Sequence, residues 1–481
     1  MITLTLGEIA EITGGHLVNA APSVAVTGAV EYDSRKVGPG GLFVAFEGEQ
    51  VDGHTYAGTA VEAGAAGVLS TRDTGQPGVL VKEPLVALAA LAHAVVDRLD
   101  HLTIVGLTGS SGKTTTKDYI GQLLARLGPT IAPAGSLNNE LGFPYTVLQA
   151  TGETRFLVLE MGARGPGHIR YLTDIARPQI GVVLNVGAAH IGEFGTVEGT
   201  ARAKGELVEA LPEAGVAILN ADDALVAAMA ARTAARVLPV GEAADALVRA
   251  VDVTLDAAGR AAYTLVAGGR SGPVRLGVTG RHQVANTLAA AGVALTAGMA
   301  IDEVTAALGE ISIVSSRRMD VFQRPDGVTV IDDSYNANPS STAAALHSLA
   351  AMAGGRRTTA VLGYMAELGE QERAGHEEVG RLAAELGVDR LIAVAENARP
   401  VLDGAHGVPE WTGTAIFAAD QAAAIELVKG DLHADDVVLV KGSRYRTWDV
   451  VDSLRPGARS ERSEPRSRGL GQLSPSEEVR P

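Results

Sequence analysis

A glycine-rich loop between an apolar strand and a helix constrains the fold of this chain more than any other segment. The strand is LTIVGLT, the loop is GSSG (109–112), and the helix is KTTTKDYIGQLLARLG, which ends at Gly128-Pro129. A strand that turns through glycines directly into a helix begins a parallel α/β unit. The chain is therefore expected to contain at least one parallel sheet.

Apolar runs separated by helical stretches recur along the rest of the chain. They are FLVLE (156–160), IGVVLN (180–185) and VAILN (216–220) in the middle, and VTVID (328–332), TAVLG (359–363), RLIAVA (390–395) and VVLVK (437–441) towards the C-terminus. This alternation predicts two largely parallel sheets. Residues 247–279 alternate differently and predict antiparallel strands.

The length of 481 residues exceeds what one hydrophobic core usually holds and predicts about three domains. We expect an α/β protein with a small N-terminal α/β domain (1–100), which ends in the helix LVALAALAHAVVDRL (85–99). A central P-loop ATPase-like domain with a mostly parallel sheet (101–310) and a C-terminal Rossmann-like, doubly wound domain (311–454) would follow. Residues 455–481 are rich in Pro, Ser and charges and predict a disordered tail.

Composition excludes several classes of function. A formal net charge of -16 argues against broad binding to nucleic acid or to a membrane surface. No apolar run approaches the roughly 18 residues of a membrane span, and the N-terminus lacks the pattern of a signal peptide, so we expect a cytoplasmic protein. Because the chain has no cysteine, oxygen or nitrogen must hold any metal, which favours Mg²⁺.

The glycine-rich loop predicts a phosphate site, because backbone N–H groups at a helix N-terminus can surround phosphates. Lys113 would neutralise the β- and γ-phosphates, and the Thr114 hydroxyl would bind Mg²⁺. The usual G-x-x-x-x-G-K-[ST] spacing is missed by one residue, because Leu107 stands where the first glycine belongs. A flexible turn before a helix is the alternative. The expected ATP-binding residues here are Thr108, Gly109, Ser110, Ser111, Gly112, Lys113, Thr114 and Thr115.

Three other residues in the middle of the chain are candidate metal ligands. Glu160 ends the strand FLVLE, where a carboxylate can assist a phosphate-bound Mg²⁺, although a strand-end Glu is often a solvated or helix-capping residue. His190 follows the run VVLN, and an isolated His there is usually structural. Lys204 lies in the helical stretch ARAKGELVEAL, where a lysine is ordinarily a solvated charge.

The segment DDSYNANP (332–339) ends a C-terminal strand in carboxylates, amides and a proline. It lies at the carboxyl edge of the predicted sheet, where α/β proteins bind ligands. An ordinary loop is the alternative.

Taken in order, nine segments resemble the Mur ligase family, which builds the peptide stem of peptidoglycan. They are TGSSGKTTTK, SLNNELGFP, LEMGA, NVGAAHIGEFG, ARAKGE, GRHQVANTLAA, SRRM, DDSYNANPSS and LVKGSR. Within the family, DSYNANP and DSRKVGPGGLFVAFEGEQVDGH resemble the members that act last. The resemblance implies ligation of D-alanyl-D-alanine to a UDP-N-acetylmuramoyl-tripeptide by way of an acyl phosphate, giving the UDP-linked pentapeptide.

The resemblance also implies roles for particular residues. Thr114 and Glu160 would hold one Mg²⁺, and His190 with a carbamoylated Lys204 a second. Substrate contacts are expected at Ser34, Arg35, Asn138, Asn139, Asn336 and Asn338, and nucleotide contacts at Asn286, Arg318 and Asp333. Of these, Glu160, His190, Lys204, Arg318 and Asp333 join Lys113 as the expected catalytic residues.

One position departs from the family pattern: Tyr364 stands in VLGYMAELGE where relatives commonly have Asp. The resemblance otherwise implies ATP and two Mg²⁺ as cofactors, small-molecule substrates as partners, and a monomer. Two alternatives stay open. A sister ligase would add meso-diaminopimelate or lysine to a shorter precursor, or glutamate to folate, and a P-loop switch would hydrolyse nucleotide without making a bond.

Overall fold

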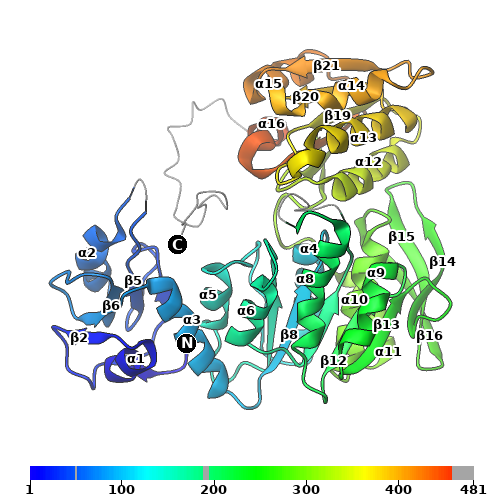
Figure 1. Cartoon of the computed structure of the whole chain (residues 1–481). Coiled ribbons are helices and arrows are strands. Elements are labelled where there is room, and N and C mark those ends of the chain that lie inside the picture. The colour runs from blue at the N-terminus through cyan, green and yellow to red at the C-terminus, as the bar shows by residue number, and fades with distance from the viewer. Residues whose placement is uncertain (49–50, 188–193, 458–481) are drawn as a thin grey trace.

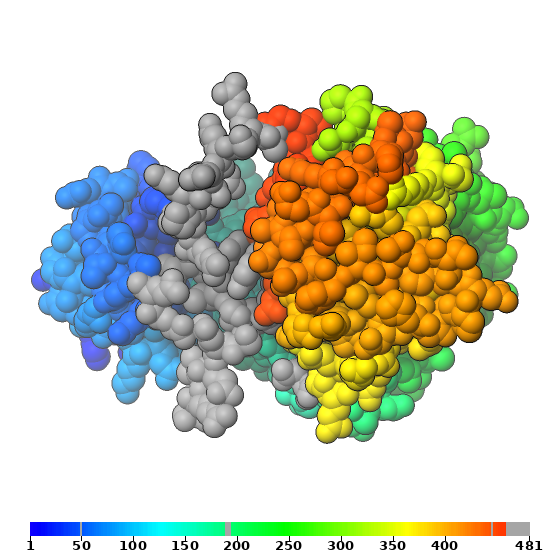
Figure 2. Space-filling view, turned by 90° about the horizontal axis from the view of Figure 1, so that it is seen from above, coloured from blue at the N-terminus to red at the C-terminus, as the bar shows by residue number. Residues whose placement is uncertain are grey.

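The computed structural model describes residues 1–48, 51–187 and 194–457. It is an α/β structure with a separate main sheet in its N-terminal, central and C-terminal parts (Figure 1). The N-terminal and C-terminal parts lie on opposite sides in both whole-molecule views (Figures 1 and 2). The expected three-domain α/β architecture is confirmed. Within these described ranges, no helix is both long enough and apolar enough to cross a bilayer.

The N-terminal part contains a five-stranded sheet in the order β2-β7-β6-β5-β4 and a small antiparallel pair, β1-β3. The strands are β1 (Leu4–Thr5), β2 (His16–Val18), β3 (Ala25–Val26), β4 (Val30–Glu31), β5 (Leu42–Val44), β6 (Gly67–Ser70) and β7 (Gly78–Leu80). The helices are α1 (Leu6–Thr13), η1 (Gly53–Tyr56), α2 (Ala57–Glu62) and α3 (Pro84–Asp97). The helix expected at 85–99 is α3, and its buried face shares one hydrophobic core with the central part.

The central part contains a nine-stranded sheet in the order β16-β15-β14-β13-β12-β11-β8-β10-β9. The strands are β8 (Thr103–Thr108), β9 (Thr130–Ile131), β10 (Phe156–Glu160), β11 (Ile180–Val183), β12 (Val216–Asn220), β13 (Arg236–Gly241), β14 (Val248–Leu255), β15 (Arg260–Ala267) and β16 (Arg270–Thr279). In this sheet order, every neighbouring pair between β14 and β9 is parallel. The pairs β14–β15 and β15–β16 are antiparallel. The antiparallel strands predicted for 247–279 are confirmed.

Helices cover this sheet on both faces. They are α4 (Lys113–Leu124), α5 (Gly142–Val147), α6 (His168–Ile175), α8 (Val197–Glu209), α9 (Ala224–Ala227), η2 (Ala228–Arg232), α10 (Gln283–Thr296) and α11 (Ile301–Glu310). The sheet places the carboxyl ends of β8, β10 and β11 side by side, because these three strands are neighbours and parallel. The loops that follow them form the candidate site.

The C-terminal part contains a six-stranded sheet in the order β17-β18-β22-β19-β20-β21, parallel except for the edge strand β17. The strands are β17 (Asp320–Gln323), β18 (Thr329–Asp333), β19 (Thr358–Leu362), β20 (Arg390–Val394), β21 (Thr414–Ala418) and β22 (Val437–Lys441). The helices are α12 (Pro339–Ala353), η3 (Gly369–Gln371), α13 (Glu372–Glu385), η4 (Glu396–Ala398), α14 (Pro400–His406), α15 (Gln421–Gly430), η5 (Arg444–Thr447) and α16 (Trp448–Leu454).

Arg455, directly after α16, still contacts the C-terminal sheet. Its guanidinium donates to Asp320 at 2.7 Å and to Asp332 at 3.0 Å. Asp332 is completely buried, and burial raises the pKa of its carboxyl group, an effect that Arg455 opposes. The residues that the C-terminal part uses for folding therefore extend past Leu454.

Two truncations should behave differently. Ending the chain at Gly457 removes only residues with little capacity to form a core, so melting temperature and turnover should stay unchanged. Ending it at Leu454 also removes Arg455 and should cost about 1–3 kcal/mol of unfolding free energy, because a buried carboxylate loses a charged hydrogen-bond donor. Thermal unfolding measures both. A melting temperature that drops by several degrees in the Gly457 truncation would mean that residues 458–481 dock on the body.

Candidate active site

The glycine-rich loop lies between β8 and α4, as its sequence predicts. The Thr108 hydroxyl donates to the Met161 carbonyl at 2.9 Å, which ties the start of the loop to the end of β10. Gly112 has φ 79°, and a Cβ there would lie 2.6 Å from Oδ1 of Asn286. A side chain at this position is thus excluded both by the left-handed backbone and by Asn286. The N-terminus of α4 directs backbone N–H groups into the loop, as an anion site requires.

Asn185 holds the loop in shape. Its Oδ1 accepts from the Ser111 N–H at 2.9 Å, and its Nδ2 donates to the Ser111 carbonyl at 3.2 Å. The Asn185 carbonyl accepts from the Ser110 N–H at 3.0 Å. The sequence prediction did not single out Asn185. It could have been found from its position, because it ends a predicted strand beside the glycine-rich loop.

Lys113, Thr114 and Glu160 come together at the start of α4. The Lys113 ammonium donates to the Gly109 carbonyl at 2.8 Å, and the Thr114 hydroxyl donates to Oε2 of Glu160 at 2.8 Å. Glu160 reaches Thr114 because β10 pairs with β8 in parallel. Burial lowers the pKa of Lys113, the Arg318 charge lowers it further, and Glu160 opposes both. The site thus holds a cation and an anion side by side.

The Glu160 carboxylate is fixed from its other side. Its Oε1 accepts from the Ser136 hydroxyl at 2.9 Å and from Nδ2 of Asn138 at 2.7 Å. A threonine hydroxyl beside an oriented carboxylate offers the oxygen ligands that Mg²⁺ prefers. No cluster of three or more His, Asp or Glu that could hold a metal occurs among the described residues. The donors present thus fit Mg²⁺ that takes its remaining ligands from phosphates and water, and do not fit an all-protein cage.

The adjacent residues Asn138 and Asn139 make different contacts. Asn138 contacts Glu160, as above, whereas Oδ1 of Asn139 accepts from the Gly142 N–H at 2.8 Å. That bond holds the start of α5. In this structure Asn139 is occupied with the local backbone.

Lys204 lies on α8 with 1% of its surface exposed. Burial, reinforced by the nearby Lys113 charge, lowers the pKa of its amine well below the usual value. The solvated surface charge considered as an alternative for Lys204 is therefore wrong. The other predicted ligand of the same metal, His190, lies outside the described residues.

The C-terminal part contributes Arg318 and Asn338 to this site. The Arg318 guanidinium donates to the Thr114 hydroxyl at 3.3 Å and lies 4.1 Å from the centre of the Tyr335 ring. Its Nε is buried and has no hydrogen-bond partner among the described residues. Nδ2 of Asn338 donates to the Ser110 carbonyl at 3.4 Å. The C-terminal part therefore contacts the glycine-rich loop directly.

Asp333 is paired with a lysine that the sequence prediction missed. The Lys441 ammonium donates to Asp333 and, at 3.0 Å, to the Asn336 carbonyl. Oδ1 of Asp333 accepts from the Met319 N–H at 3.1 Å, next to Arg318. The Asn336 side chain is exposed. Asp333 thus supports the segment that carries Arg318.

Ser34 and Arg35 lie apart from this cluster, after β4 in the N-terminal part. The Arg35 guanidinium donates to both carboxylate oxygens of Asp33, each at 2.8 Å. The end of β4 nevertheless contacts the central part, because the Tyr145 hydroxyl of α5 donates to the Glu31 carboxylate at 3.2 Å. The bond to α5 therefore links the N-terminal pair Ser34 and Arg35 to the central cluster. Glu31 lies a few residues before Ser34, and Tyr145 lies a few residues after Asn139.

Tyr364 lies two residues after the end of β19, and its phenol donates to Glu372 at 2.7 Å. Its ring stacks on His376 with 5.5 Å between centroids, and the Arg446 guanidinium lies 5.1 Å from its centroid. Tyr364 is thus tied to the start of α13.

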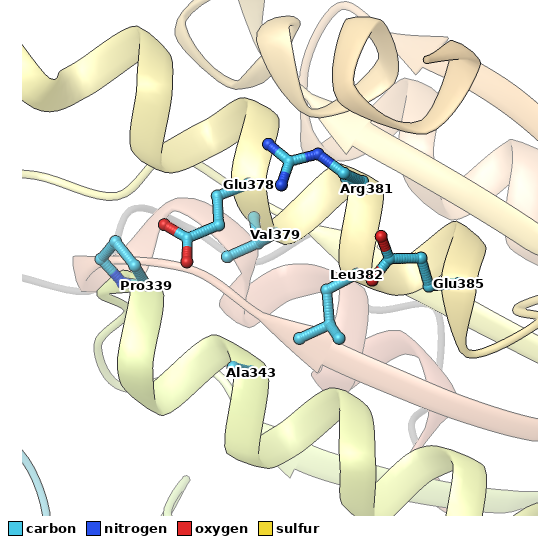
Figure 3. Close-up of a pocket in the computed structure, with 7 residues that line it drawn as sticks. All are labelled: Pro339, Ala343, Glu378, Val379, Arg381, Leu382 and Glu385. Carbon is cyan, nitrogen blue, oxygen red and sulfur yellow. The ribbon is translucent and has the colours of Figure 1, made fainter. Parts of the chain in front are cut away.

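A pocket of about 150 Å³ lies between α12 and α13 (Figure 3). Its lining residues are Pro339, Ala343, Glu378, Val379, Arg381, Leu382 and Glu385. None of them is a predicted site residue, although Pro339 directly follows Asn338. The chemistry described above lies elsewhere, around the glycine-rich loop.

Comparison with known proteins places the chain in a family. Three family models match successive parts of the chain. They are described as "Mur ligase family, catalytic domain" (residues 27–101), "Mur ligase middle domain" (107–294) and "Mur ligase, glutamate ligase domain" (317–444). A Mycobacterium tuberculosis protein named UDP-N-acetylmuramoyl-tripeptide--D-alanyl-D-alanine ligase is 49% identical, over 92% of this chain and 96% of its own length.

Solved structures that resemble this chain indicate the same family. MurF from Acinetobacter baumannii is 31% identical with a TM-score of 0.83, over 94% of this chain and 98% of that one. MurF ligase from Thermotoga maritima in complex with ADP is 29% identical with a TM-score of 0.75, over 88% and 97%. On this evidence the chain belongs to the Mur ligase family.

Proposed function

We propose that this chain is an ATP-dependent ligase that joins D-alanyl-D-alanine to UDP-N-acetylmuramoyl-tripeptide and so makes the pentapeptide precursor of peptidoglycan. The observation that carries the proposal is the site in which Lys113, the Thr114–Glu160 pair and Arg318 surround one glycine-rich loop. The names of the relatives with high identity over nearly the whole chain support the choice of substrates. ATP use is supported by the ADP complex of the Thermotoga maritima relative.

The proposed reaction has two stages. A carboxylate oxygen of the tripeptide attacks the γ-phosphorus of ATP, the bond to the β-phosphate oxygen breaks, and ADP leaves. The amine of D-alanyl-D-alanine then attacks the acyl carbon, loses a proton, and the phosphate leaves with the electrons of the C–O bond. The acyl phosphate is needed because a free carboxylate has no adequate leaving group.

Residues of the central part would stabilise the first stage. The Lys113 ammonium and the N-terminus of α4 would face the phosphates and would stabilise charge on the transferring oxygens. Arg318 would add a second cation from the C-terminal part. Thr114 and Glu160 would hold Mg²⁺, which would supply further charge stabilisation when bound.

A second Mg²⁺ would be held by His190 and a carbamoylated Lys204. An ammonium has no lone pair to offer a metal, whereas a carbamate offers two oxygens. The burial of Lys204 supports this proposal, because it favours the neutral amine that reacts with carbon dioxide.

The three parts would divide the substrates between them. Ser34 and Arg35 would bind the uridine nucleotide end in the N-terminal part, and Asn336 and Asn338 would face the dipeptide in the C-terminal part. Asn138 and Asn139 would contact the substrate on the phosphate side, Asn286 the adenine, and Asp333 the nucleotide. Closure of these parts would exclude water from the acyl phosphate, which otherwise hydrolyses. We further propose a cytoplasmic monomer.

The experiment is a phosphate-release assay with ATP, Mg²⁺, purified UDP-N-acetylmuramoyl-tripeptide and D-alanyl-D-alanine, in which each co-substrate is omitted in turn and then both together. We expect phosphate release to require both co-substrates and the pentapeptide to appear in equal amount. Release that needs neither would indicate a nucleotide switch. Product formed only from a shorter precursor with meso-diaminopimelate or lysine would indicate a sister ligase.

A further inference from the structure

The segment between α11 and the C-terminal sheet lies along one side of helix α4. Four residues of α4 and its end, spaced four apart, bond to it in reverse order. The Arg126 guanidinium donates to Glu310 at 2.5 Å, Gln122 exchanges two 3.0 Å hydrogen bonds with the Ser312 backbone, Oδ2 of Asp118 accepts from the Ser315 N–H at 2.9 Å, and the Thr114 hydroxyl accepts from Arg318 at 3.3 Å. Because residues four apart share one helix face, the segment 310–318 follows α4 for its whole length.

Asp118 is a buried member of this row, with 5% of its surface exposed. Its carboxylate pairs with the Lys117 ammonium at 3.0 Å, and both side chains are almost completely buried. Lys117 in turn donates to the Gly135 carbonyl at 2.9 Å, and the Ser315 hydroxyl accepts from the Gly135 N–H at 2.9 Å. Asp118 therefore joins α4, the loop that leads to Ser136 and Asn138, and the segment that leads to Arg318.

The backbone changes character directly after Ser315. Arg317 and Met319 have φ of 60° and 52°, in the left-handed region that residues other than glycine rarely adopt, and they flank Arg318. The Arg317 side chain belongs to the C-terminal part, because it donates to Asp452 at 2.7 Å and lies 4.7 Å from the centre of the Trp448 ring. The transition from the central to the C-terminal part thus lies between Ser315 and Arg317, directly after the residue that Asp118 bonds.

We propose that Asp118 is a positioning residue for the ligase reaction, acting through Arg318. By fixing the Ser315 backbone to α4, it sets where the strained 317–319 turn begins and delivers the Arg318 guanidinium to Thr114. In this proposal Asp118 acts through the Ser315 backbone and does not itself contact the nucleotide or the substrate. The proposal rests on the proposed function, in which Arg318 contacts the nucleotide.

Two substitutions separate the roles of the Asp118 carboxylate. Asp118→Ala removes both the acceptor for Ser315 and the partner of Lys117, whereas Asp118→Asn keeps an oxygen acceptor for the Ser315 N–H and loses only the charge. Both variants should lower the melting temperature. We expect kcat to fall about 10- to 100-fold in Asp118→Ala, because Arg318 is misplaced, but to stay within about threefold of wild type in Asp118→Asn. The KM for UDP-tripeptide should stay unchanged in both.

The matched control is Arg126→Ala, which removes the exposed pair with Glu310 at the far end of the same row. Its kcat should equal that of wild type, since exposed ion pairs contribute little. If kcat falls equally in Asp118→Ala and Asp118→Asn, in step with melting temperature, then Asp118 acts only through the Lys117 charge pair and the proposal is wrong.

A double-mutant cycle on ADP affinity, measured by calorimetry, tests the path through Arg318 without needing ligation. Asp118→Ala and Arg318→Ala should each weaken ADP binding severalfold, and adding Asp118→Ala to the Arg318→Ala variant should have no further effect. Effects that multiply would show that Asp118 acts independently of Arg318 and overturn the proposal. Failure of the wild-type protein to ligate would instead contradict the proposed function and leave this cycle readable.

Discussion

Replacing Lys113 by alanine is expected to lower kcat by about 10²- to 10³-fold while leaving the protein folded. Charge on the phosphate oxygens is redistributed during transfer, and the Lys113 ammonium is held at the N-terminus of α4 by the Gly109 carbonyl. Each tenfold loss corresponds to about 1.4 kcal/mol of barrier, so the expected loss is about 3–4 kcal/mol. Steady-state kinetics at saturating substrates, with thermal unfolding in parallel, measures the effect.

The control for this prediction is Lys429→Ala, which removes the same charge from an exposed position on α15. Its kcat should match that of wild type. Near-normal ligation by a folded Lys113→Ala protein would remove Lys113 from the mechanism. The conservative Lys113→Arg should recover little activity, since a guanidinium cannot occupy the narrow position of an ammonium beside Gly109.

The parallel strands of this fold were predictable because burial on both faces makes them continuous apolar runs. β10, β12 and β22 begin and end where the sequence runs do. Several strands were not predicted, and β13 and β21 show two different reasons. β13 has Pro239 in its interior, which argues against a central strand, yet it lies between β12 and β14. β21 is an edge strand, in which only Ala418 is buried, so it lacks the continuous burial of the central strands.

The candidate site was predictable where one segment carried the chemistry and less so where partners came from distant segments. The phosphate loop follows from strand, glycines and helix together. Lys441 and Asp333 meet because they end adjacent parallel strands, at the same register in β22 and β18. A pattern in the local sequence cannot show that two strands more than a hundred residues apart are neighbours in the sheet. Asn185 and Ser136 were missed for the same reason, since each bonds to a residue from another segment of the chain.

The roles of Lys204 and Arg318 came from the resemblance to the Mur ligase family and not from local pattern. A lysine in a helical stretch such as ARAKGELVEAL usually predicts a solvated charge, and only the nine-motif order argued otherwise. Its burial in α8 removes that alternative. Lys204 is buried because α8 packs with this side chain facing inwards, near Lys113. The hydrophobic periodicity of the α8 sequence does not reveal that packing.

Replacing Lys204 by alanine is expected to disable ligation, with a loss at least as large as that of Lys113→Ala. Carbon dioxide reacts only with the neutral amine, and an unperturbed lysine with a pKa near 10.4 is neutral about once in a few thousand molecules at pH 7. Burial and the Lys113 charge lower the pKa of Lys204, so the neutral form is more abundant. Carbamoylation, as proposed, would then convert a cation that repels Mg²⁺ into an anion with two oxygen ligands.

A chemical rescue distinguishes this role from packing. A short-chain carboxylate such as acetate or propionate, added to the Lys204→Ala protein, would place an anionic oxygen donor in the space that the carbamate leaves and should restore part of the activity. Lys204→Met, which fills the space without charge, should preserve the fold yet gain less from the added carboxylate. The same salts should not raise the lowered activity of Lys113→Ala, since they supply no cation. The direct measurement is carbon-13 NMR of the Mg²⁺-ATP form in labelled bicarbonate, in which a carbamate resonance should appear in wild type and be absent from both Lys204 variants. An active wild-type enzyme that shows no such resonance at saturating bicarbonate would contradict the carbamate.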